Sequence, residues 1–246
     1  MGKMVVRQVA MQRDMKLVAA IDSPSCQDVG KDIGKLAGSG WLGVEVIGAE
    51  EIADVLARVK PNVLIDFTTT EAVVQNVKAA AETGVSIVVG TTGLTKQQRK
   101  KTGEIVKREN IKAVISPNFS VGVNVFFKSI GEMARLLGKD YEPSVEEVHH
   151  SGKRDTPSGT ALKVAQIVSE KMNVKKEKIK IRSTREGDVV GDHTVKFSNP
   201  YENIKIIHRA KTRETFAAGA IRAAHYVATK GKRGVIKEMQ DVLDLK

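Results

Sequence analysis

The chain has 246 residues, one cysteine and a formal net charge of +11. A lone cysteine excludes an intrachain disulfide and a cysteine-ligated metal cluster, which is typical of a cytoplasmic protein, and no apolar run is long enough to cross a membrane. The basic charge favours anionic partners, but aromatic residues make up only 4% of the chain. Because stacking on single-stranded nucleic acid needs aromatic side chains, we expect a cytoplasmic protein without nucleic-acid or membrane partners.

The first half of the chain alternates short apolar runs with helical patterns. The apolar runs predict strands at residues 17–21, 63–67, 85–89 and 111–115, and the helical patterns lie at 49–59, 71–82 and 96–109. Short buried strands that alternate with helices predict a parallel sheet covered by helices on both faces. Ligands bind at the carboxyl ends of the strands in such sheets, and Asp22, Thr68 and Gly90 follow the predicted strands there.

The pattern changes after Phe119. A long helix is predicted at 121–137, followed by strand-like runs at 143–149, 178–183, 193–197 and 203–208, with a helix at 158–172 among them. Since no helix separates the last three runs, a mostly antiparallel sheet is expected. The sequence therefore predicts a second, α+β domain, and a helix at 220–229 near the end of the chain.

The segment from Glu146 to Ala161 gathers the candidate chemistry in one stretch. Two adjacent histidines end a predicted strand, a lysine and an aspartate follow in a loop, and Pro-Ser-Gly-Thr opens a helix. Histidine and lysine side chains exchange protons near neutral pH when their surroundings tune them, and a helix N-terminus attracts carboxylates and phosphates. Each residue alone has a simpler explanation as a strand end, a solvated charge or an N-cap. Together they predict an enzyme that acts on an acidic small molecule.

This segment resembles the signature of the 4-hydroxy-tetrahydrodipicolinate reductase (dihydrodipicolinate reductase) family, E-x-H-H-x-x-K-x-D-x-P-S-G-T-A. Every defined position is matched from Glu147 to Ala161. The similarity extends along nearly the whole chain, in family order, through Leu17-Val18-Ala19-Ala20-Ile21-Asp22, Ile65-Asp66-Phe67-Thr68, Gly90-Thr91-Thr92-Gly93, Pro117-Asn118-Phe119-Ser120-Val121-Gly122-Val123-Asn124 and Asp241-Val242-Leu243-Asp244-Leu245.

The resemblance implies a reductase with a Rossmann-like parallel-sheet domain. It implies reduction of 4-hydroxy-tetrahydrodipicolinate, a small dicarboxylic cyclic imine, to tetrahydrodipicolinate by NADH or NADPH in diaminopimelate and lysine biosynthesis. The implied domains are a dinucleotide-binding domain at 1–119, a substrate-binding and oligomerisation domain at 120–218, and C-terminal helices at 219–246 that return to the first domain. A homotetramer built through the sheet of the second domain is also implied.

The resemblance also implies roles for individual residues. His149 would be the proton donor or acceptor and Lys153 the proton donor. His150, Gly159 and Thr160 would hold the substrate carboxylates. The implied cofactor-binding residues are Gly2, Lys3, Met4, Asp22, Gly90, Thr91, Thr92, Ser116, Pro117, Asn118 and Phe119.

The start of the chain departs from the family pattern. A dinucleotide-binding fold opens with a strand, a glycine-rich loop and a helix, whereas this chain begins Met1-Gly2-Lys3-Met4 and then enters a helical pattern. Asp22 follows Gly2 at about the 20-residue spacing expected between that loop and the acidic residue that binds the cofactor ribose. We expect the first strand to lie upstream of Met1; the alternative is a rearranged variant that binds the cofactor poorly. Without that central strand the sheet should divide in two.

Cofactor preference stays open in the sequence. An acidic residue at position 22 favours NADH, because its carboxylate accepts hydrogen bonds from the ribose hydroxyls. Ser23 stands where many family members carry arginine, which removes one contact to a 2′-phosphate, but Lys3 could still supply charge there. No metal site is expected, because His149 and His150 are adjacent and would point to opposite faces of a strand.

Three other polar residues are expected to support the reacting groups or to lie at an interface. Asp155 is expected to pair with Lys153 or orient its loop, and Arg185 and His193 are expected behind the reacting groups or at an interface.

One alternative function is another NAD(P)-dependent reductase of a small imino or oxo acid, since fold does not fix function. The other is a basic, non-catalytic nucleic-acid-binding protein, suggested by the net charge.

Overall fold

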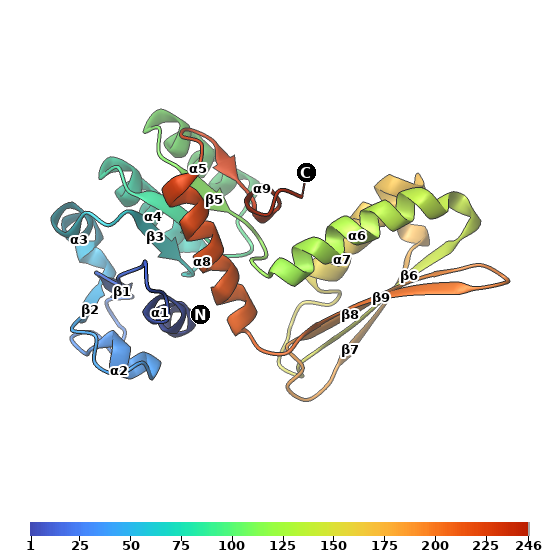
Figure 1. Cartoon of the computed structure of the whole chain (residues 1–246), viewed down its shortest axis with the longest axis horizontal. Helices are drawn as coiled ribbons and strands as arrows, with labels where there is room; N and C mark the ends of the chain where they lie inside the picture. The colour runs from blue at the N-terminus through green and yellow to red at the C-terminus, as the bar shows by residue number, and fades with distance from the viewer. Residues whose placement is uncertain (246) are drawn as a thin grey trace. The chain divides into compact units, whose positions relative to one another are not determined.

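The computed structural model describes residues 1–245. The chain forms two compact units, the first made of Met1–Ser120 and Glu214–Asp244 and the second of Val121–Arg213 (Figure 1). Each unit has its own hydrophobic core; the first unit contains two sheets and the second contains one. Among residues 1–245, no helix combines the length and the apolar character needed to span a bilayer.

The first unit contains the predicted parallel strands, but they lie in two sheets. Four parallel strands form one sheet in the order β10 (Ile236–Lys237), β5 (Ala113–Ile115), β4 (Ser86–Val89) and β3 (Val63–Asp66). The second sheet pairs β1 (Ala20–Asp22) with β2 (Val46–Gly48) in parallel. The sheet is therefore divided, as expected for a doubly wound sheet without its central strand. β1 is shorter than the predicted run at 17–21, because its ladder to β2 covers only Ala20–Asp22.

Helices cover both faces of the four-stranded sheet. Ile87 and Val89 of β4 share one core cluster with apolar residues of α3 (Ile52–Val59), α4 (Thr70–Glu82) and α5 (Lys96–Arg108). Side chains alternate along a strand, so the buried Val88 points to the opposite face, where α8 packs against β3, β4 and β5. α8 (Glu214–Thr229) also packs along α1 (Gly2–Ala10). The shorter elements are α2 (Ile33–Ala37), η1 (Ala49–Glu51) and α9 (Met239–Val242).

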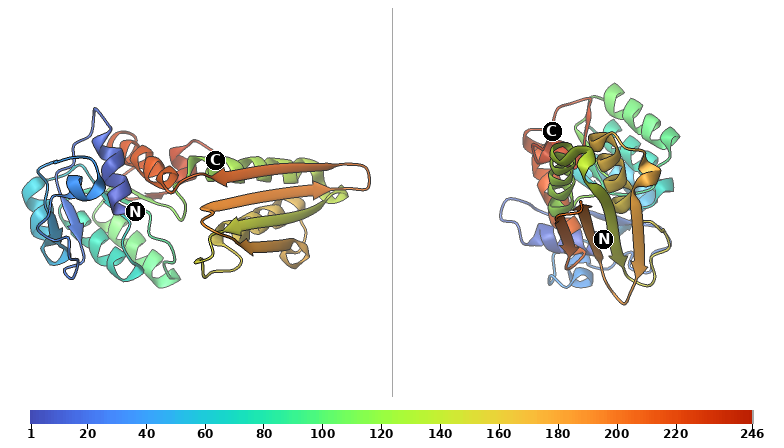
Figure 2. Two further views of the ribbon diagram at one scale, coloured as in Figure 1. Left: turned by 90° about the horizontal axis from the view of Figure 1, so that it is seen from below. Right: turned by 90° about the vertical axis from the view of Figure 1, so that its right-hand side faces the viewer.

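The second unit is a four-stranded sheet with two helices on one side (Figure 2). The strand order is β7 (Lys180–Arg185), β6 (Glu142–His149), β8 (Gly191–Ser198) and β9 (Asn203–Ala210). β6 pairs with β7 in parallel, whereas the β6–β8 and β8–β9 pairs are antiparallel, which confirms the mostly antiparallel prediction. The helices are α6 (Val121–Leu137) and α7 (Gly159–Met172), with short turns at η2 (Gly138–Asp140) and η3 (Lys176–Lys178).

The helix-facing side of this sheet changes character along its length. At one end Val145, Val195 and Phe197 are buried in the core with α6 and α7. At the other end the same face carries buried polar residues from β6 and β8, namely Glu147, His149 and His193. Burying polar groups is costly unless they bond to one another, so this end of the sheet is where a functional site is expected.

The structure extends the sequence prediction in three places. β2, α2 and β10 were not predicted, and each is only a few residues long. α8 begins at Glu214, ahead of the predicted start at 220. Gly219 of α8 allows a close approach to Phe119, because a Cβ at position 219 would lie 1.8 Å from the carbonyl oxygen of Phe119. The glycine lets α8 rest directly on the backbone that follows β5.

Candidate active site

The predicted strand–loop–helix segment forms as expected. β6 ends at His149, and α7 begins at Gly159 with Ser158 as its N-cap. The Ser158 side chain accepts a hydrogen bond from the backbone N–H of Ala161 at 3.2 Å. This bond satisfies one of the free N–H groups of the first helical turn, so the loop between the histidines and the helix is fixed at both ends.

Glu147 is the most buried charged residue of the second unit, at 1% exposure. Its Oε1 atom accepts hydrogen bonds from Arg185 Nη2 at 3.1 Å and from the backbone N–H of Ser158 at 3.2 Å. Its Oε2 atom contacts Nδ1 of His149. Burial by itself raises the pKa of Glu147, but the neighbouring Ser183 hydroxyl, the Arg185 guanidinium, His149 and the Ser158 N–H together hold that pKa at about 2. Glu147 is therefore a carboxylate across the physiological pH range.

Three histidines lie in a row on the inner face of the sheet. His193 is the cross-strand partner of Glu147 on one side and of His208 on the other. The rings of His149 and His193 meet edge to face with centroids 5.1 Å apart, and those of His193 and His208 are 6.2 Å apart. His193 Nε2 lies 3.4 Å from Ser158 Oγ. The row connects the end of β6 to the start of α7.

Burial keeps these histidines uncharged. Burial is the main cause that lowers the pKa of His193 to about 3, and the neighbouring imidazoles of His149 and His208 contribute to that shift. Burial also lowers the pKa of His149, although the charge and hydrogen bond of Glu147 oppose that shift. At neutral pH, His149 therefore has one nitrogen available to accept a proton.

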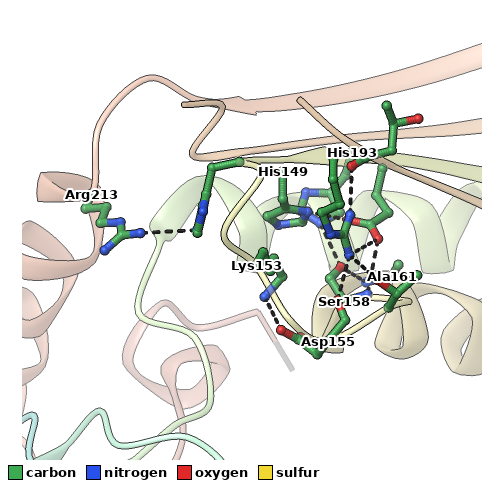
Figure 3. A network of polar contacts seen from close by, with 12 residues as sticks. His149, Lys153, Asp155, Ser158, Ala161, His193 and Arg213 are labelled. Carbon is green, nitrogen blue, oxygen red and sulfur yellow. Dashed lines mark hydrogen bonds and ion pairs between the residues drawn. The ribbon is translucent and has the colours of Figure 1, made fainter. Parts of the chain in front are cut away.

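Lys153 and Asp155 lie in the loop that leads to α7 (Figure 3). Lys153 Nζ donates to Asp155 Oδ1 at 2.8 Å, so the predicted pairing is confirmed. That hydrogen bond is the largest influence that lowers the pKa of Asp155, and the backbone N–H of Gly159 contributes as well. A carboxylate thus pairs with Lys153, the predicted proton donor, in the loop just before Gly159 and Thr160, which are predicted to hold a substrate carboxylate.

His150 lies apart from His149. It follows the last residue of β6 and is half-buried, and its Nε2 lies 3.3 Å from Arg213 Nη2. Gly159 and Thr160 occupy the first turn of α7, and a Cβ built on Gly159 would meet no atom within 4 Å. The space beside this helix start is open enough for a small anion.

Glu147, His149 and His193 offer ligand atoms that all lie within 4.8 Å of one another. The Glu147 oxygens already accept hydrogen bonds from Arg185 and Ser158 and contact His149 Nδ1. A guanidinium beside the carboxylate repels a second cation, and the direct contact between glutamate and histidine leaves no reason to invoke an ion. We therefore describe this cluster as a hydrogen-bonded network; the expectation of no metal stays a prediction.

The predicted cofactor residues lie in the first unit, mostly where strands end. Asp22 ends β1 and is exposed, Gly90 and Thr91 follow β4, and Ser116 follows β5. Gly90 is required by packing, because a Cβ there would lie 2.2 Å from the Phe67 ring. The remaining predicted residues after these strands are Thr92, Pro117, Asn118 and Phe119.

The turn after β5 is closed by short hydrogen bonds. Ser116 Oγ donates to the Asn118 carbonyl at 3.2 Å, and Asn118 Oδ1 accepts from the backbone N–H of Ser120 at 2.9 Å. Phe119 is 2% exposed and packs on Phe67 with ring centroids 5.7 Å apart. Phe119 therefore acts in the core of the unit, while the backbone around it shapes the edge of the sheet.

The predicted residues at the chain start lie in the first turn of α1. These are Gly2, Lys3 and Met4, and the first two are exposed. Lys3 Nζ donates to Asp28 Oδ2 at 2.9 Å, and this hydrogen bond raises the pKa of Lys3. Asp22 accepts from the backbone N–H of Ser23 at 2.7 Å, which shapes the turn after β1.

Asp66 connects two loops of the first unit through hydrogen bonds that the sequence did not predict. This residue ends β3 and is 3% exposed. It accepts hydrogen bonds from the N–H and hydroxyl of Thr68 at 2.8 and 2.7 Å, from Asn76 Nδ2 at 2.8 Å and from Thr91 Oγ1 at 3.3 Å. It therefore joins the loop after β3 to the loop after β4, at the edge predicted to bind the cofactor.

Comparison with known proteins gives the family. Residues 1–119 match the model for the N-terminal part of dihydrodipicolinate reductase, and residues 122–243 match the model for its C-terminal part. The chain belongs to the dihydrodipicolinate reductase family. It is therefore a nicotinamide-dependent oxidoreductase of diaminopimelate and lysine biosynthesis, and the family's activity is the reduction of 4-hydroxy-tetrahydrodipicolinate.

Curated relatives agree across the full chain. The 4-hydroxy-tetrahydrodipicolinate reductase of Methanosphaera stadtmanae is 44% identical over 262 residues, covering 100% of this chain and 96% of the relative. That of Methanocaldococcus jannaschii is 43% identical over 260 residues, with 100% and 94% coverage.

Solved structures agree on the fold. A dipicolinate-bound dihydrodipicolinate reductase from Paenisporosarcina sp. TG-14 superposes with a TM-score of 0.78 at 23% identity, covering 98% of this chain and 94% of that one. An amine dehydrogenase from Mycobacterium smegmatis gives a TM-score of 0.59 at 13% identity, with 94% and 90% coverage.

The sequence predicted Arg185 and His193 either behind the reacting groups or at an interface. The structure places both of them next to Glu147 and His149. Arg185 binds Glu147, and His193 packs on the His149 ring. The sequence signature contains Glu147, but no role was assigned to it. Strand alternation could have found it, because residues 147 and 149 share one face of β6.

Proposed function

We propose that the chain reduces 4-hydroxy-tetrahydrodipicolinate with NADH or NADPH, using His149 and Lys153 to handle protons. The observation that supports these roles is the loop geometry: Lys153 donates to the Asp155 carboxylate at 2.8 Å in the short loop between His149 and the start of α7. The same groups can hold a carboxylate of the dicarboxylic substrate. His150, Gly159 and Thr160 complete this carboxylate-binding set.

The proton-handling residues have complementary states. Lys153 carries an ammonium group that can donate a proton, while the neutral His149 can accept one. Bound NADH or NADPH supplies the hydride. Negative charge that develops on the substrate ring as it is reduced is neutralised by a nearby cationic acid, which is the role we give to Lys153.

The first unit would hold the cofactor. Backbone groups at Gly90, Thr91 and Thr92 and around Ser116, Pro117 and Asn118 stand at the carboxyl edge of the parallel sheet, where dinucleotides bind in such folds. Gly2, Lys3 and Met4 lie in the first turn of α1, and the Lys3 ammonium lies close enough to Asp22 for the two charges to interact. This arrangement suits a phosphate beside a ribose.

Two charged residues bear on the choice between NADH and NADPH. The carboxylate of Asp22 favours the ribose hydroxyls of NADH. Lys3 is bonded to Asp28, but its side chain is 51% exposed and can still reach a 2′-phosphate. The ratio of kcat/KM for NADH and NADPH, compared between the wild type and Lys3→Ala, tests this: loss of Lys3 should lower the value for NADPH more than that for NADH.

A homotetramer through the second unit is part of the proposal. Within residues 121–213, both helices lie on one side of the sheet, and the other side exposes strand residues such as Lys205, Ile207 and Arg209. Ile207 is 52% exposed, so its apolar side chain is available for contact with another copy of the chain. Light scattering should give a tetramer mass for the wild type and a smaller mass for Ile207→Asp.

The deciding experiment measures oxidation of NADH and NADPH with enzymatically generated 4-hydroxy-tetrahydrodipicolinate. We expect turnover with at least one cofactor, and none when the substrate-generating enzyme is omitted. No turnover with either cofactor would overturn the proposed substrate. A filter-binding assay across salt concentrations tests the expectation of no nucleic-acid partner, since phosphate contacts give a steep salt dependence.

A further inference from the structure

The contacts of Glu147 determine the charge and the orientation of its carboxyl group. One oxygen accepts from Arg185 at 3.1 Å and from the Ser158 N–H at 3.2 Å, and the other faces His149 Nδ1. The side chain is 0% exposed. A buried carboxylate is stable only when its oxygens are satisfied, so Arg185 and Ser158 fix both the charge and the orientation of Glu147.

A carboxylate only accepts hydrogen bonds. His149 Nδ1 must therefore be the donor in its contact with Glu147, and the neutral ring carries its hydrogen on Nδ1. The lone pair is then left on Nε2. The tautomer of His149 therefore follows from two facts: Glu147 is a carboxylate held by its own donors, and Nδ1 is the ring nitrogen that faces it.

The other edge of the ring faces a position without a side chain. A Cβ built on Gly191 of β8 would lie 3.0 Å from His149 Nε2 and 3.3 Å from Cδ2. His193 packs against the ring with an interplanar angle of 77°. The imidazole is held by Glu147 and His193, and the absence of a side chain at Gly191 lets the Nε2 edge of the ring lie against β8 without crowding.

We propose that Glu147, clamped by Arg185, is a positioning residue that fixes His149 in the Nδ1–H tautomer, so that protons enter and leave only through Nε2. This inference rests on the proposed function, in which His149 handles protons. When Nε2 takes up a proton the ring becomes an imidazolium, and when it releases that proton the ring is neutral again. Glu147 keeps the Nδ1 hydrogen bond in both states and does not itself change protonation.

Solid-state ¹⁵N NMR of histidine-labelled enzyme tests the tautomer without any assay of activity. The chain has only 5 histidines, so the His149 signals can be identified by their loss in His149→Gln. We expect a protonated Nδ1 and an unprotonated Nε2 near neutral pH. A hydrogen on Nε2 in the wild type would overturn the proposal, whatever the substrate proves to be.

Glu147→Gln is the matching variant. Arg185 and the Ser158 N–H both donate, so they should hold the oxygen of the new amide and turn its NH₂ group toward His149 Nδ1. Nδ1 would then become an acceptor, and the hydrogen would move to Nε2. We expect kcat to fall by roughly 10²–10⁴, the scale seen when a catalytic histidine loses its proton function or tautomer, with the KM for the cofactor within about twofold.

The control is Glu170→Gln, which neutralises an exposed carboxylate on α7 in the same unit. It should keep kcat and the His149 tautomer unchanged. Glu147→Gln with kcat within about threefold of the wild type would overturn the proposal. If Glu147→Gln does not fold, the wild-type NMR result decides. Failure of the wild type to turn over the substrate would count against the proposed function and leave the tautomer result standing.

Discussion

Each unit buries one carboxylate near the end of a strand, and the two are held in different ways. Asp66 of the first unit is bonded to neutral groups, namely the N–H and hydroxyl of Thr68 and the amide of Asn76. Glu147 of the second unit is bonded to the guanidinium of Arg185 and contacts an imidazole. The exposures are similar, at 3% and 1%.

The difference shows how the same chemical group serves two purposes. Neutral donors around Asp66 join two loops without linking them to proton uptake, which suits a rigid binding edge. Charged and titratable partners around Glu147 couple its position to the protonation of His149, which suits chemistry. We therefore expect changes near Asp66 to act on cofactor binding and changes near Glu147 to act on turnover.

Lys153→Ala should produce the largest effect. Removing the proton donor should lower kcat by about 10²–10⁴, the usual scale for losing positioned acid–base help. The KM for the cofactor should change little, because Lys153 lies in the second unit. Steady-state kinetics with Lys163→Ala as the exposed-lysine control checks this. Turnover near that of the wild type would remove Lys153 from the mechanism.

Asp66→Asn should act on binding instead. An amide places an NH₂ group opposite one of the donors that now bond to Asp66, and an unsatisfied buried group costs about 1–3 kcal/mol. The loops after β3 and β4 should loosen, so the Kd for the cofactor should rise about tenfold, which corresponds to about 1.4 kcal/mol, with kcat at saturating cofactor nearly unchanged. Fluorescence titration of NADH, with the exposed Asp54→Asn as control, measures it. A fall in kcat without weaker binding would contradict the comparison.

The second unit should lose stability in mild acid. The pKa of His193 is about 3 in the folded chain, against an ordinary value of 6.5. The unfolded chain therefore binds more protons below pH 6.5, so the stabilisation is complete above that pH and is lost as the pH falls toward 3. Each such histidine contributes up to about 1.4 kcal/mol per pH unit.

Urea unfolding between pH 7 and 4.5 measures this dependence, with His193→Gln as the variant. The glutamine can still bond to Ser158 but takes up no proton, so its stability should vary less with pH. His149 and His208 should account for part of the remaining slope, because burial also lowers the pKa of each. An equal slope in the variant and the wild type would show that His193 does not titrate on unfolding.

A pair of N-cap variants should give the smallest effect. Ser158 caps α7 beside the histidines, whereas Thr95 caps α5 of the first unit in a capping box with Gln98. Replacing either by alanine should cost about 1 kcal/mol of stability. Only Ser158→Ala should also lower kcat, because it removes the hydroxyl that lies 3.4 Å from His193 Nε2. Equal activity in both variants would limit Ser158 to capping.

Several elements could be predicted because local signals were strong. The long amphipathic helix at Val121–Leu137 was predicted with the bounds that the structure shows, and the helix predicted at 158–172 differs from α7 only in that Ser158 is its N-cap. β2 and β10 were missed, since strands of two or three residues carry too little periodicity to be distinguished from loops. Their existence depends on neighbours that complete their hydrogen bonds.

The sequence by itself determined the chemistry that this chain carries. The spacing of His149, Lys153, Asp155 and the helix start is local, so one short segment was enough to indicate proton transfer beside an anion-binding helix end. The sequence also specified alternating strands and helices, from which a parallel sheet follows.

Only the tertiary structure decided how that chemistry is tuned. Glu147, Arg185 and His193 come from three different strands, and Asp66 meets Thr91 across two loops. No local pattern states which residues face each other across a sheet, because pairing depends on register and on the burial that the whole core imposes. The charge state of His149 depends on these distant neighbours, so it could be read only once the strands were in place.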